Sequence, residues 1–293
     1  MREILRLLKE RGPLTGRELY ELTGVEVFEL WRSCNASKDL IIKKVGRHYL
    51  RFDKDVEGYA RLSPAIQREF LTYSVVGLKK DEVKVRQKAR KLSLEIKKIS
   101  QRKFELAKSA IAEMIAKLGD AQIKNVCFVI GGDVAVEMAH NNLRPERSTG
   151  ELVTGSDLDI VVMTRDDFSG LKELDEAMHK TKAALLKLHR EEIDYKIKSS
   201  SKVAEQAKFD TFEHIIACKI MNEAKFLYGS KSVYKQVLRI LKESSVPEKL
   251  KKLEKIAVEK RKEAEEYLLR KGKISEEEYF KLFTTTEEFG EIF

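Results

Sequence analysis

The sequence lacks any long apolar run. No stretch approaches the roughly 20 apolar residues that a membrane-spanning helix needs, and residues 1–12 have charges at helical spacing, unlike a signal peptide. We therefore expect no membrane partner. Apolar residues nevertheless make up 42% of the 293 residues, which is enough for a core and excludes a disordered chain. This length suits one large domain or two modest ones.

Cysteine and the side-chain amides are also scarce. The three cysteines, Cys34, Cys127 and Cys218, are odd in number, far apart and set in apolar surroundings. This usage predicts reduced, buried thiols and a cytoplasmic location, and no Cys/His spacing resembles a zinc site. Five Asn and six Gln beside many Lys and Glu form a thermophile-like balance.

Positive charge is in excess and unevenly distributed. The 57 Lys+Arg and 48 Asp+Glu residues leave a net charge of +9, which favours an anionic partner. Residues 79–117 contain 13 basic and 5 acidic residues, a net charge of +8. Residues 1–63 contain 13 basic and 10 acidic residues, a net charge of +3. Residues 79–118 contain no Pro or Gly and repeat apolar residues at threes and fours, which predicts one long helix or two nearly continuous ones. A solvated connector explains its basic face better than a nucleic-acid surface does.

The first 53 residues read as three short helices followed by a β-hairpin. Thr15 and Glu18 have the spacing of a capping box for the second helix, which Gly24 ends. Residues 25–37 form the third helix. The strands at 41–45 and 48–50 flank a Gly46-Arg47 turn. This order resembles the winged helix-turn-helix of DNA-binding domains.

The winged-helix resemblance implies that helix 25–37 enters a groove and that Gly46-Arg47 forms the wing tip. Glu26 and Glu29 on the same helix would be repelled by phosphates, and winged helices also contact proteins or position substrates. The partner of this domain therefore stays open between nucleic acid and protein. The candidate nucleic-acid contacts are Arg32, Lys38, Lys43, Lys44 and Arg47.

Beyond the predicted helix at 63–77, capped by Ser63 and stopped by Gly77, helices and strands alternate from residue 119. Strands are expected at 124–132, 156–163 and 191–198, and helices at 133–141 and 169–189, with a loop at 142–154. Only helices are expected after residue 200, the first of them covering 210–229. The predicted domains are a winged helix (1–62), a helical connector (63–118), an α/β (α+β) core of a sheet with flanking helices (119–200) and a C-terminal helical region (201–293).

Acidic residues stand at the start of one of these apolar strands. In "GSDLDIVV", Asp157 and Asp159 are two residues apart, so they project from the same face of a strand. Asp194 lies between Ile193 and Tyr195 on the next strand and can join them. Adjacent carboxylates repel one another unless a divalent cation lies between them, and Mg²⁺ takes carboxylate and phosphate oxygens.

Gly131-Gly132, Asp157-Leu158-Asp159 and Ile193-Asp194 together resemble the DNA polymerase β-like nucleotidyltransferase superfamily, over about residues 105–240. That family's motif is an apolar residue followed by Gly-Gly or Gly-Ser, then an Asp-x-Asp strand and a third acidic residue on a later strand. The "FLYGS" segment at 226–230 is similar to a helix end in many small nucleotidyltransferases. The 24 residues between Gly132 and Asp157 are about twice the usual number.

The resemblance implies an enzyme that moves an NMP from an NTP to a hydroxyl acceptor in nucleic acid, such as RNA or tRNA, or in protein, with release of pyrophosphate. Asp157, Asp159 and Asp194 would be the catalytic residues and the ligands of two Mg²⁺ ions, with Asp194 helping to deprotonate the acceptor. The expected triphosphate contacts are Gly131, Gly132, Ser156, Lys196 and Lys219. Lys196 could instead pair with a carboxylate.

Two alternatives remain open at this stage. The insertion at 140–155 could hold acceptor substrate through Arg144 and Arg147 or act as a lid, or Gly131-Gly132 could be only a strand-to-helix turn. In place of an enzyme, the chain could be a DNA-binding regulator whose nucleotidyltransferase-like domain senses nucleotides without turnover.

Overall fold

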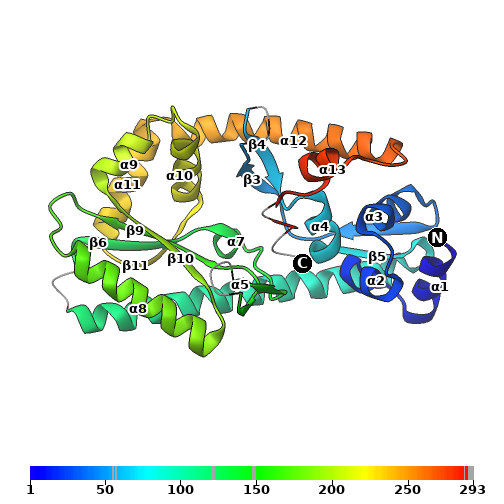
Figure 1. Ribbon diagram of the computed structural model, residues 1–293, viewed down its shortest axis with the longest axis horizontal. Coiled ribbons are helices and arrows are strands. Elements are labelled where there is room, and N and C mark those ends of the chain that lie inside the picture. The colour runs from blue at the N-terminus through cyan, green and yellow to red at the C-terminus, as the bar shows by residue number, and fades with distance from the viewer. Residues whose placement is uncertain (55, 57, 120–122, 147–149, 287, 290–293) are drawn as a thin grey trace. The chain divides into compact units, whose positions relative to one another are not determined.

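The computed structural model describes residues 1–293 except 55, 57, 120–122, 147–149, 287 and 290–293. The fold is mixed α/β, with many helices and small sheets of two to four strands (Figure 1). Two compact units are present: residues 1–96 with 254–293, and residues 97–253. Helices α5 (Glu82–Leu118) and α12 (Val246–Arg270) each contribute to both units. None of the helices in the described part of the chain combines the length and apolarity needed to cross a bilayer.

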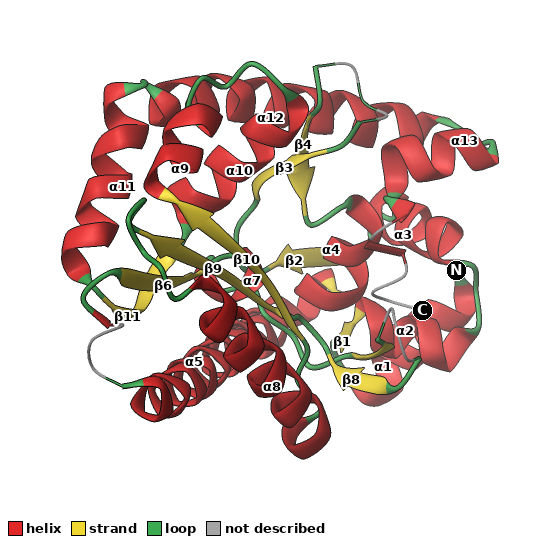
Figure 2. Cartoon of the chain, turned by 60° about the vertical axis from the view of Figure 1, so that its left-hand side comes forward, coloured by secondary structure: helices red, strands yellow, loops and turns green. Residues whose placement is uncertain are grey.

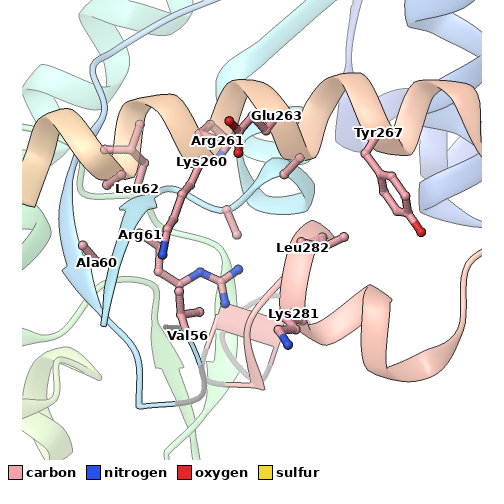
Figure 3. Close-up of a pocket in the computed structure, with 13 residues that line it drawn as sticks. Val56, Ala60, Arg61, Leu62, Lys260, Arg261, Glu263, Tyr267, Lys281 and Leu282 are labelled. Atoms are coloured by element: carbon pink, nitrogen blue, oxygen red, sulfur yellow. The ribbon is translucent and has the colours of Figure 1, made fainter. Parts of the chain in front are cut away.

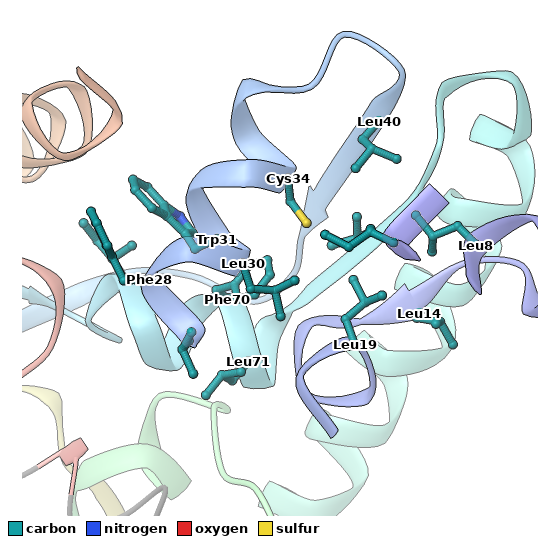
Figure 4. Close-up of a cluster of buried hydrophobic side chains, with 14 of the residues drawn as sticks. Leu8, Leu14, Leu19, Phe28, Leu30, Trp31, Cys34, Leu40, Phe70 and Leu71 are labelled. Carbon is teal, nitrogen blue, oxygen red and sulfur yellow. The ribbon is translucent and has the colours of Figure 1, made fainter. Parts of the chain in front are cut away.

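The three N-terminal helices of the first unit agree with the sequence prediction. The capping box is present at α2: Thr15 Oγ1 accepts from the Glu18 N–H at 3.2 Å, and the Glu18 carboxylate accepts from the Thr15 N–H at 2.6 Å. Gly24, at φ 61°, ends this helix. Apolar side chains from all three helices form one buried cluster with α4 and the neighbouring strands (Figure 4). The helices are α1 (Arg2–Arg11), α2 (Gly16–Thr23) and α3 (Val27–Ala36).

The predicted β-hairpin at 41–50 is wrong, because its two strands belong to different sheets. β2 (Leu40–Lys44) pairs antiparallel with β5 (Ser74–Leu78), whereas β3 (Tyr49–Phe52) pairs with β4 (Ala60–Ser63). With the short β1 (Leu14–Thr15), the first sheet has the order β1-β5-β2. β5 lies outside the expected winged-helix segment, and it pairs with β2 in place of the second strand of the predicted hairpin.

The predicted helix at 63–77 is also only partly formed. α4 (Ile66–Tyr73) begins after Ala65 rather than after Ser63, and the chain then becomes β5. All five residues of β5 are buried, and a Cβ on Gly77 would lie 2.4 Å from Val85 Cγ2. The Ser-Val-Val-Gly-Leu run therefore forms a buried strand. Its glycine, Gly77, does not stop a helix but leaves room for the Val85 side chain to pack against the strand.

The C-terminal segment packs within the first unit. Phe283 is fully buried, with its ring centroid 5.2 Å from that of Phe28 and 5.5 Å from that of Trp31, both on α3. Such edge-to-face aromatic contacts add to the stability gained by area burial. The remaining elements of this unit are the 3₁₀ turn η1 (Lys79–Asp81), α13 (Glu276–Glu278) and the π-helical turn η2 (Tyr279–Phe283).

The second unit is built around a four-stranded sheet of order β10-β9-β6-β11. β9 and β10 are parallel, whereas β6 runs antiparallel to both β9 and β11. In Figures 1 and 2, α5 and α8 lie on one side of this sheet and α9, α10 and α11 on the other. The strands are β6 (Val126–Ile130), β9 (Leu158–Thr164), β10 (Ile193–Ser199) and β11 (Lys225–Gly229). The helices are α8 (Leu171–His189), α9 (Ser200–Gln206), α10 (Phe212–Glu223) and α11 (Lys231–Glu243).

Strand alternation divides the sheet into an apolar face and a mixed face. Phe128, Ile160, Val162 and Ile193 pack in one cluster with α5 and α8. Asp159 and Asp194 lie on the other face, because successive strand residues alternate. The three core strands predicted from the sequence are therefore confirmed, and their acidic residues share the face turned away from the main core.

Three predictions for the second unit are wrong. Residues 225–229, expected within a helix, form β11 at the sheet edge, so the 201–293 segment is not wholly helical. The helix expected at 133–141 is the single turn α7 (Gly132–Ala135), which ends before Glu137 at φ 61°. The expected loop contains a hairpin of β7 (Leu143–Pro145) and β8 (Leu152–Thr154).

All three cysteines are free and buried, as the sequence predicted. Burial raises the pKa of the Cys34 and Cys127 thiols to about 12 and that of Cys218 to about 11. These thiols are therefore protonated at neutral pH and behave as small apolar side chains.

Candidate active site

The parallel pairing of β9 and β10 brings the predicted carboxylates to one end of the sheet. Asp159 and Asp194 are direct register partners, and Asp157 stands two residues before Asp159. The Leu158 N–H donates to Glu192 O at 2.8 Å, which fixes the start of the two strands relative to each other. We call Asp133, Asp157, Asp159 and Asp194 the acidic edge.

The Gly131-Gly132 turn packs directly against Asp159. The Gly131 N–H donates to the Asp159 carbonyl at 2.8 Å, and Gly132 has φ 58°. A Cβ on Gly132 would lie 1.8 Å from Asp159 Oδ2, so a larger residue would displace the carboxylate. Both the backbone conformation and the close approach therefore require glycine at this position.

The charges of the acidic edge are poorly compensated. Burial raises the pKa of Asp159 well above its usual range, and the neighbouring Asp157, Asp194 and Asp133 raise it further, whereas Lys219 lowers it. Partial burial likewise raises the pKa of Asp157, against the lowering effect of Arg144. The ionised carboxylates repel one another in a region of reduced dielectric, which is the condition that a bound cation relieves.

Asp133 is the acidic residue that the sequence reasoning missed. It belongs to the single turn α7, immediately after the glycine pair, and its Oδ2 accepts a hydrogen bond from Ser156 Oγ at 2.8 Å. Ser156, predicted as a phosphate contact, is buried, and its hydroxyl also accepts from the His140 N–H at 3.2 Å. A carboxylate directly after the Gly-Gly motif was the available signal.

A buried arginine stands behind the acidic edge. Arg144 Nε donates to Gly155 O at 2.9 Å, and Arg144 Nη2 lies 2.8 Å from Glu192 Oε2 and 3.9 Å from Asp157 Oδ2. Arg144 is buried, whereas the Asp157 side chain is 36% exposed. The guanidinium therefore holds Asp157 from the protein side. Arg147, the other candidate acceptor contact, lies outside the described residues.

A second buried cation braces the same region. Lys103 of α5 forms an ion pair with Glu191, just before β10, and donates to Thr154 O at 2.7 Å. Both side chains are fully buried, and Arg102 Nη2 reaches the other oxygen of Glu191 at 3.1 Å. The pair ties α5 to β8 and to the segment that leads into β10, and so fixes the backbone before Asp194.

Of the two predicted lysines, one lies near the acidic edge. Lys219 of α10 is close enough to influence the Asp159 carboxyl, and its Nζ lies 3.0 Å from Glu223 Oε2. Lys196 is exposed and shares a strand face with Asp194 and Lys198. Burial and, to a smaller extent, the neighbouring Lys196 lower the pKa of Lys198 to about 8. This part of the mixed face therefore changes from acidic to basic along β10.

Two of the five nucleic-acid candidates of the first unit, Arg32 and Lys44, are engaged in contacts within that unit. Arg32 Nη1 donates to the carbonyls of Lys271 and Gly272, both at 2.6 Å. Lys44 Nζ lies 2.6 Å from Glu69 Oε2 and 3.1 Å from Glu265 Oε1. These contacts use two of the cations to hold the first unit together. Lys38, Lys43, Lys44 and Arg47 are exposed, whereas Arg32 is half-buried.

The acidic edge fits a hard divalent cation in chemistry but does not form a ready-made cage. Its donors are carboxylate oxygens, which Mg²⁺ prefers, and their mutual repulsion favours a cation. Among the residues that the structure describes, no three Asp, Glu, His or Cys side chains converge closely enough to hold one ion. Ligation therefore requires the carboxylates to turn toward a shared ion.

Comparison of the chain with protein-family models, curated proteins and solved structures returned no match.

Proposed function

We propose that the second unit is an Mg²⁺-dependent nucleotidyltransferase that moves an NMP from an NTP to a hydroxyl acceptor. The observation that supports this most is the register pairing of Asp159 with Asp194, beside Asp157 and against the Gly131-Gly132 turn. The order of these features along the chain is that of the DNA polymerase β-like nucleotidyltransferases. A mixed sheet that brings the three carboxylates to one end is what such a reaction needs.

In this proposal Asp157 and Asp159 would hold two Mg²⁺ ions and Asp194 would share one of them. Bound Mg²⁺ supplies positive charge to the entering and leaving oxygens of an in-line displacement. The acceptor oxygen forms a bond to the α-phosphorus while the bond to the β-phosphate bridging oxygen breaks. Pyrophosphate leaves, and the Asp194 carboxylate takes up the acceptor proton.

Other residues would position the substrate. The Gly131-Gly132 turn lets the backbone approach a triphosphate. Lys219 and Lys196 would offset phosphate charge, and Arg144 would hold Asp157 in place through its contacts with Glu192 and Gly155. Ser156, through Asp133 and the His140 N–H, would fix the backbone before Asp157.

A DNA-binding regulator is the weaker proposal for the whole chain. The hairpin expected to form its wing is replaced by other strand pairings, and Arg32 on the expected recognition helix binds the carbonyls of Lys271 and Gly272. The first unit could still position an acceptor for the second.

The first test is incubation of the full chain with Mg²⁺, α-³²P-labelled NTPs and pooled RNA, DNA and protein acceptors. We expect the wild type to label an acceptor and Asp159→Asn to reduce the rate by about 10²–10⁴-fold, the range for loss of a positioned acid–base or charge-stabilising group. The matched control is Asp167→Asn, an exposed change in the loop between β9 and α8, outside the acidic edge. The proposal fails if the wild type labels no acceptor, or if Asp159→Asn labels as well as Asp167→Asn.

A further inference from the structure

A cavity of about 410 Å³ lies within the first unit, away from every residue discussed as catalytic. It is bounded by β4, the part of α12 after residue 256, and η2 (Figure 3). Its volume falls in the range of roughly 300–1,000 Å³ that is usual for small-molecule sites. The cavity exists because small side chains face one another: Ala60, Ala65, Ala257 and Ala264 all line it, with Leu62 and Leu282.

One stripe of α12 forms a wall of this cavity. Ala257, Lys260, Arg261 and Ala264 are spaced by three and four residues, so they share a helix face. The two alanines leave space beside the helix, while the long side chains between them place positive charge at its margin. The same stripe therefore supplies both apolar surface and cations.

Positive charge predominates in the lining. Arg61, Lys260, Arg261 and Lys281 face the cavity, and Glu263 is the acidic residue among the described residues that line it. In Figure 3 the guanidinium of Arg61 and the amines of Lys260 and Lys281 extend toward the same side of the cavity, whereas Glu263 stays beside α12. An anionic group would therefore be attracted to that side.

Three of these cations, Arg61, Lys260 and Arg261, already interact with other groups of the protein. Arg61 Nη1 donates to Asp53 Oδ2 at 2.7 Å and its Nη2 to Thr284 O at 2.9 Å. Arg261 donates to the Glu265 and Glu69 carboxylates and to Pro64 O, each at 2.8 Å. Lys281 differs, because its Nζ has no hydrogen-bond or ion-pair partner among the described residues. It can bind an anion without breaking an existing contact.

We propose that this cavity binds a small amphipathic organic acid. Its apolar body would lie against the alanine and leucine side chains, and its carboxylate or similar anionic head would pair with Lys281 beside Arg61 and Lys260. The apolar lining excludes a bare inorganic anion as the best ligand. Lys281, which has no hydrogen-bond or ion-pair partner among the described residues, favours an anionic head over a neutral or cationic one. This site is independent of the proposed transfer reaction.

The experiment is isothermal titration calorimetry of the full chain with decanoate, and separately with decanol, which has the same chain without the charge. We expect decanoate to bind about fivefold more tightly than decanol, which is the upper end of what an exposed ion pair contributes. No binding of decanoate by the wild type, or equal binding of the two compounds, would overturn the proposal.

Two variants locate the binding site. Ala264→Phe fills the cavity and should abolish decanoate binding, and Lys281→Glu should weaken it by about tenfold or more. Lys262→Glu makes the same charge change on α12 outside the cavity lining and should leave the affinity unchanged. Unchanged binding by both Ala264→Phe and Lys281→Glu would contradict the assignment. If Ala264→Phe lowers the thermal unfolding temperature, Lys281→Glu alone decides, because it breaks no hydrogen bond or ion pair among the described residues.

Discussion

The two units treat buried carboxylates in opposite ways. In the first unit Glu288 is fully buried and accepts from Ser63 Oγ at 2.5 Å and from the Ala65 N–H at 2.7 Å, with Arg51 and Arg68 beside it. Burial alone would raise the pKa of Glu288, but these partners hold it below its usual range. In the second unit Asp159 has three acidic neighbours and its pKa is raised.

This difference distinguishes a carboxylate whose charge stabilises the fold from a set of carboxylates whose charges oppose it. The cations and donors around Glu288 make its ionised form a stabilising part of the fold, which ties the C-terminal segment to β4 and α4. At the acidic edge the neighbours of Asp159 are mainly other carboxylates, so folding brings like charges together. A bound cation would relieve their repulsion. Strongly perturbed carboxylates of this second kind are typical of functional sites.

The largest expected effect on stability is that of removing the Glu288 charge. Glu288→Gln removes the buried charge that pairs with Arg51 and with the buried Arg68, which should lower the free energy of unfolding by about 3–5 kcal/mol. Urea unfolding followed by fluorescence measures this, because Trp31 is the single tryptophan and lies in the core of the first unit. Glu277→Gln, an exposed change on α13 in the same unit, is the matched control. Equal stability of the two variants would show that the ionised Glu288 does not stabilise the fold.

Acid should destabilise the first unit through Glu69. Burial raises the pKa of Glu69, but the hydrogen bond with His48 and the charges of Arg261 and Lys44 lower it more, to about 2. Because the folded-state pKa lies below the unfolded one, this stability is present above about pH 5 and is lost as the pH falls toward 2. The loss should be roughly 3 kcal/mol.

The measurement for Glu69 is Trp31-monitored urea unfolding of the wild type and Glu69→Gln at a series of pH values. The stability difference between them should shrink across this acid range, because the wild-type side chain becomes neutral as well. A difference that stays constant from pH 6 to pH 2 would show that the ionised Glu69 contributes nothing.

Local patterns predicted much of the candidate site. The i, i+2 spacing of Asp157 and Asp159 and the apolar strand after them were sufficient to place both carboxylates on one face, and the register with Asp194 agrees with that prediction. Asp133 was missed because the sequence after Gly132 reads as a longer helix, which hides a first-turn residue at the edge of the sheet.

Non-local pairing accounts for the main errors in the fold. Gly46-Arg47 between two short β-prone runs favours a hairpin locally, but β2 finds β5 about 30 residues further along the chain. Likewise, residues 225–229 continue a helical pattern and become a strand only because the edge of β6 is available. Tertiary context overrides local propensity at both places.

The charges that folding brings together at the acidic edge should be offset when a divalent cation binds there. Differential scanning calorimetry of the wild type and Asp159→Asn, with and without Mg²⁺ at neutral pH, tests this most directly. Without Mg²⁺ we expect Asp159→Asn to be the more stable by on the order of 1 kcal/mol, because one repelling charge is removed. Mg²⁺ should stabilise the wild type and have little effect on the variant. An unchanged wild type in Mg²⁺, or equal stabilisation of Asp159→Asn, would show that the acidic edge does not bind the cation.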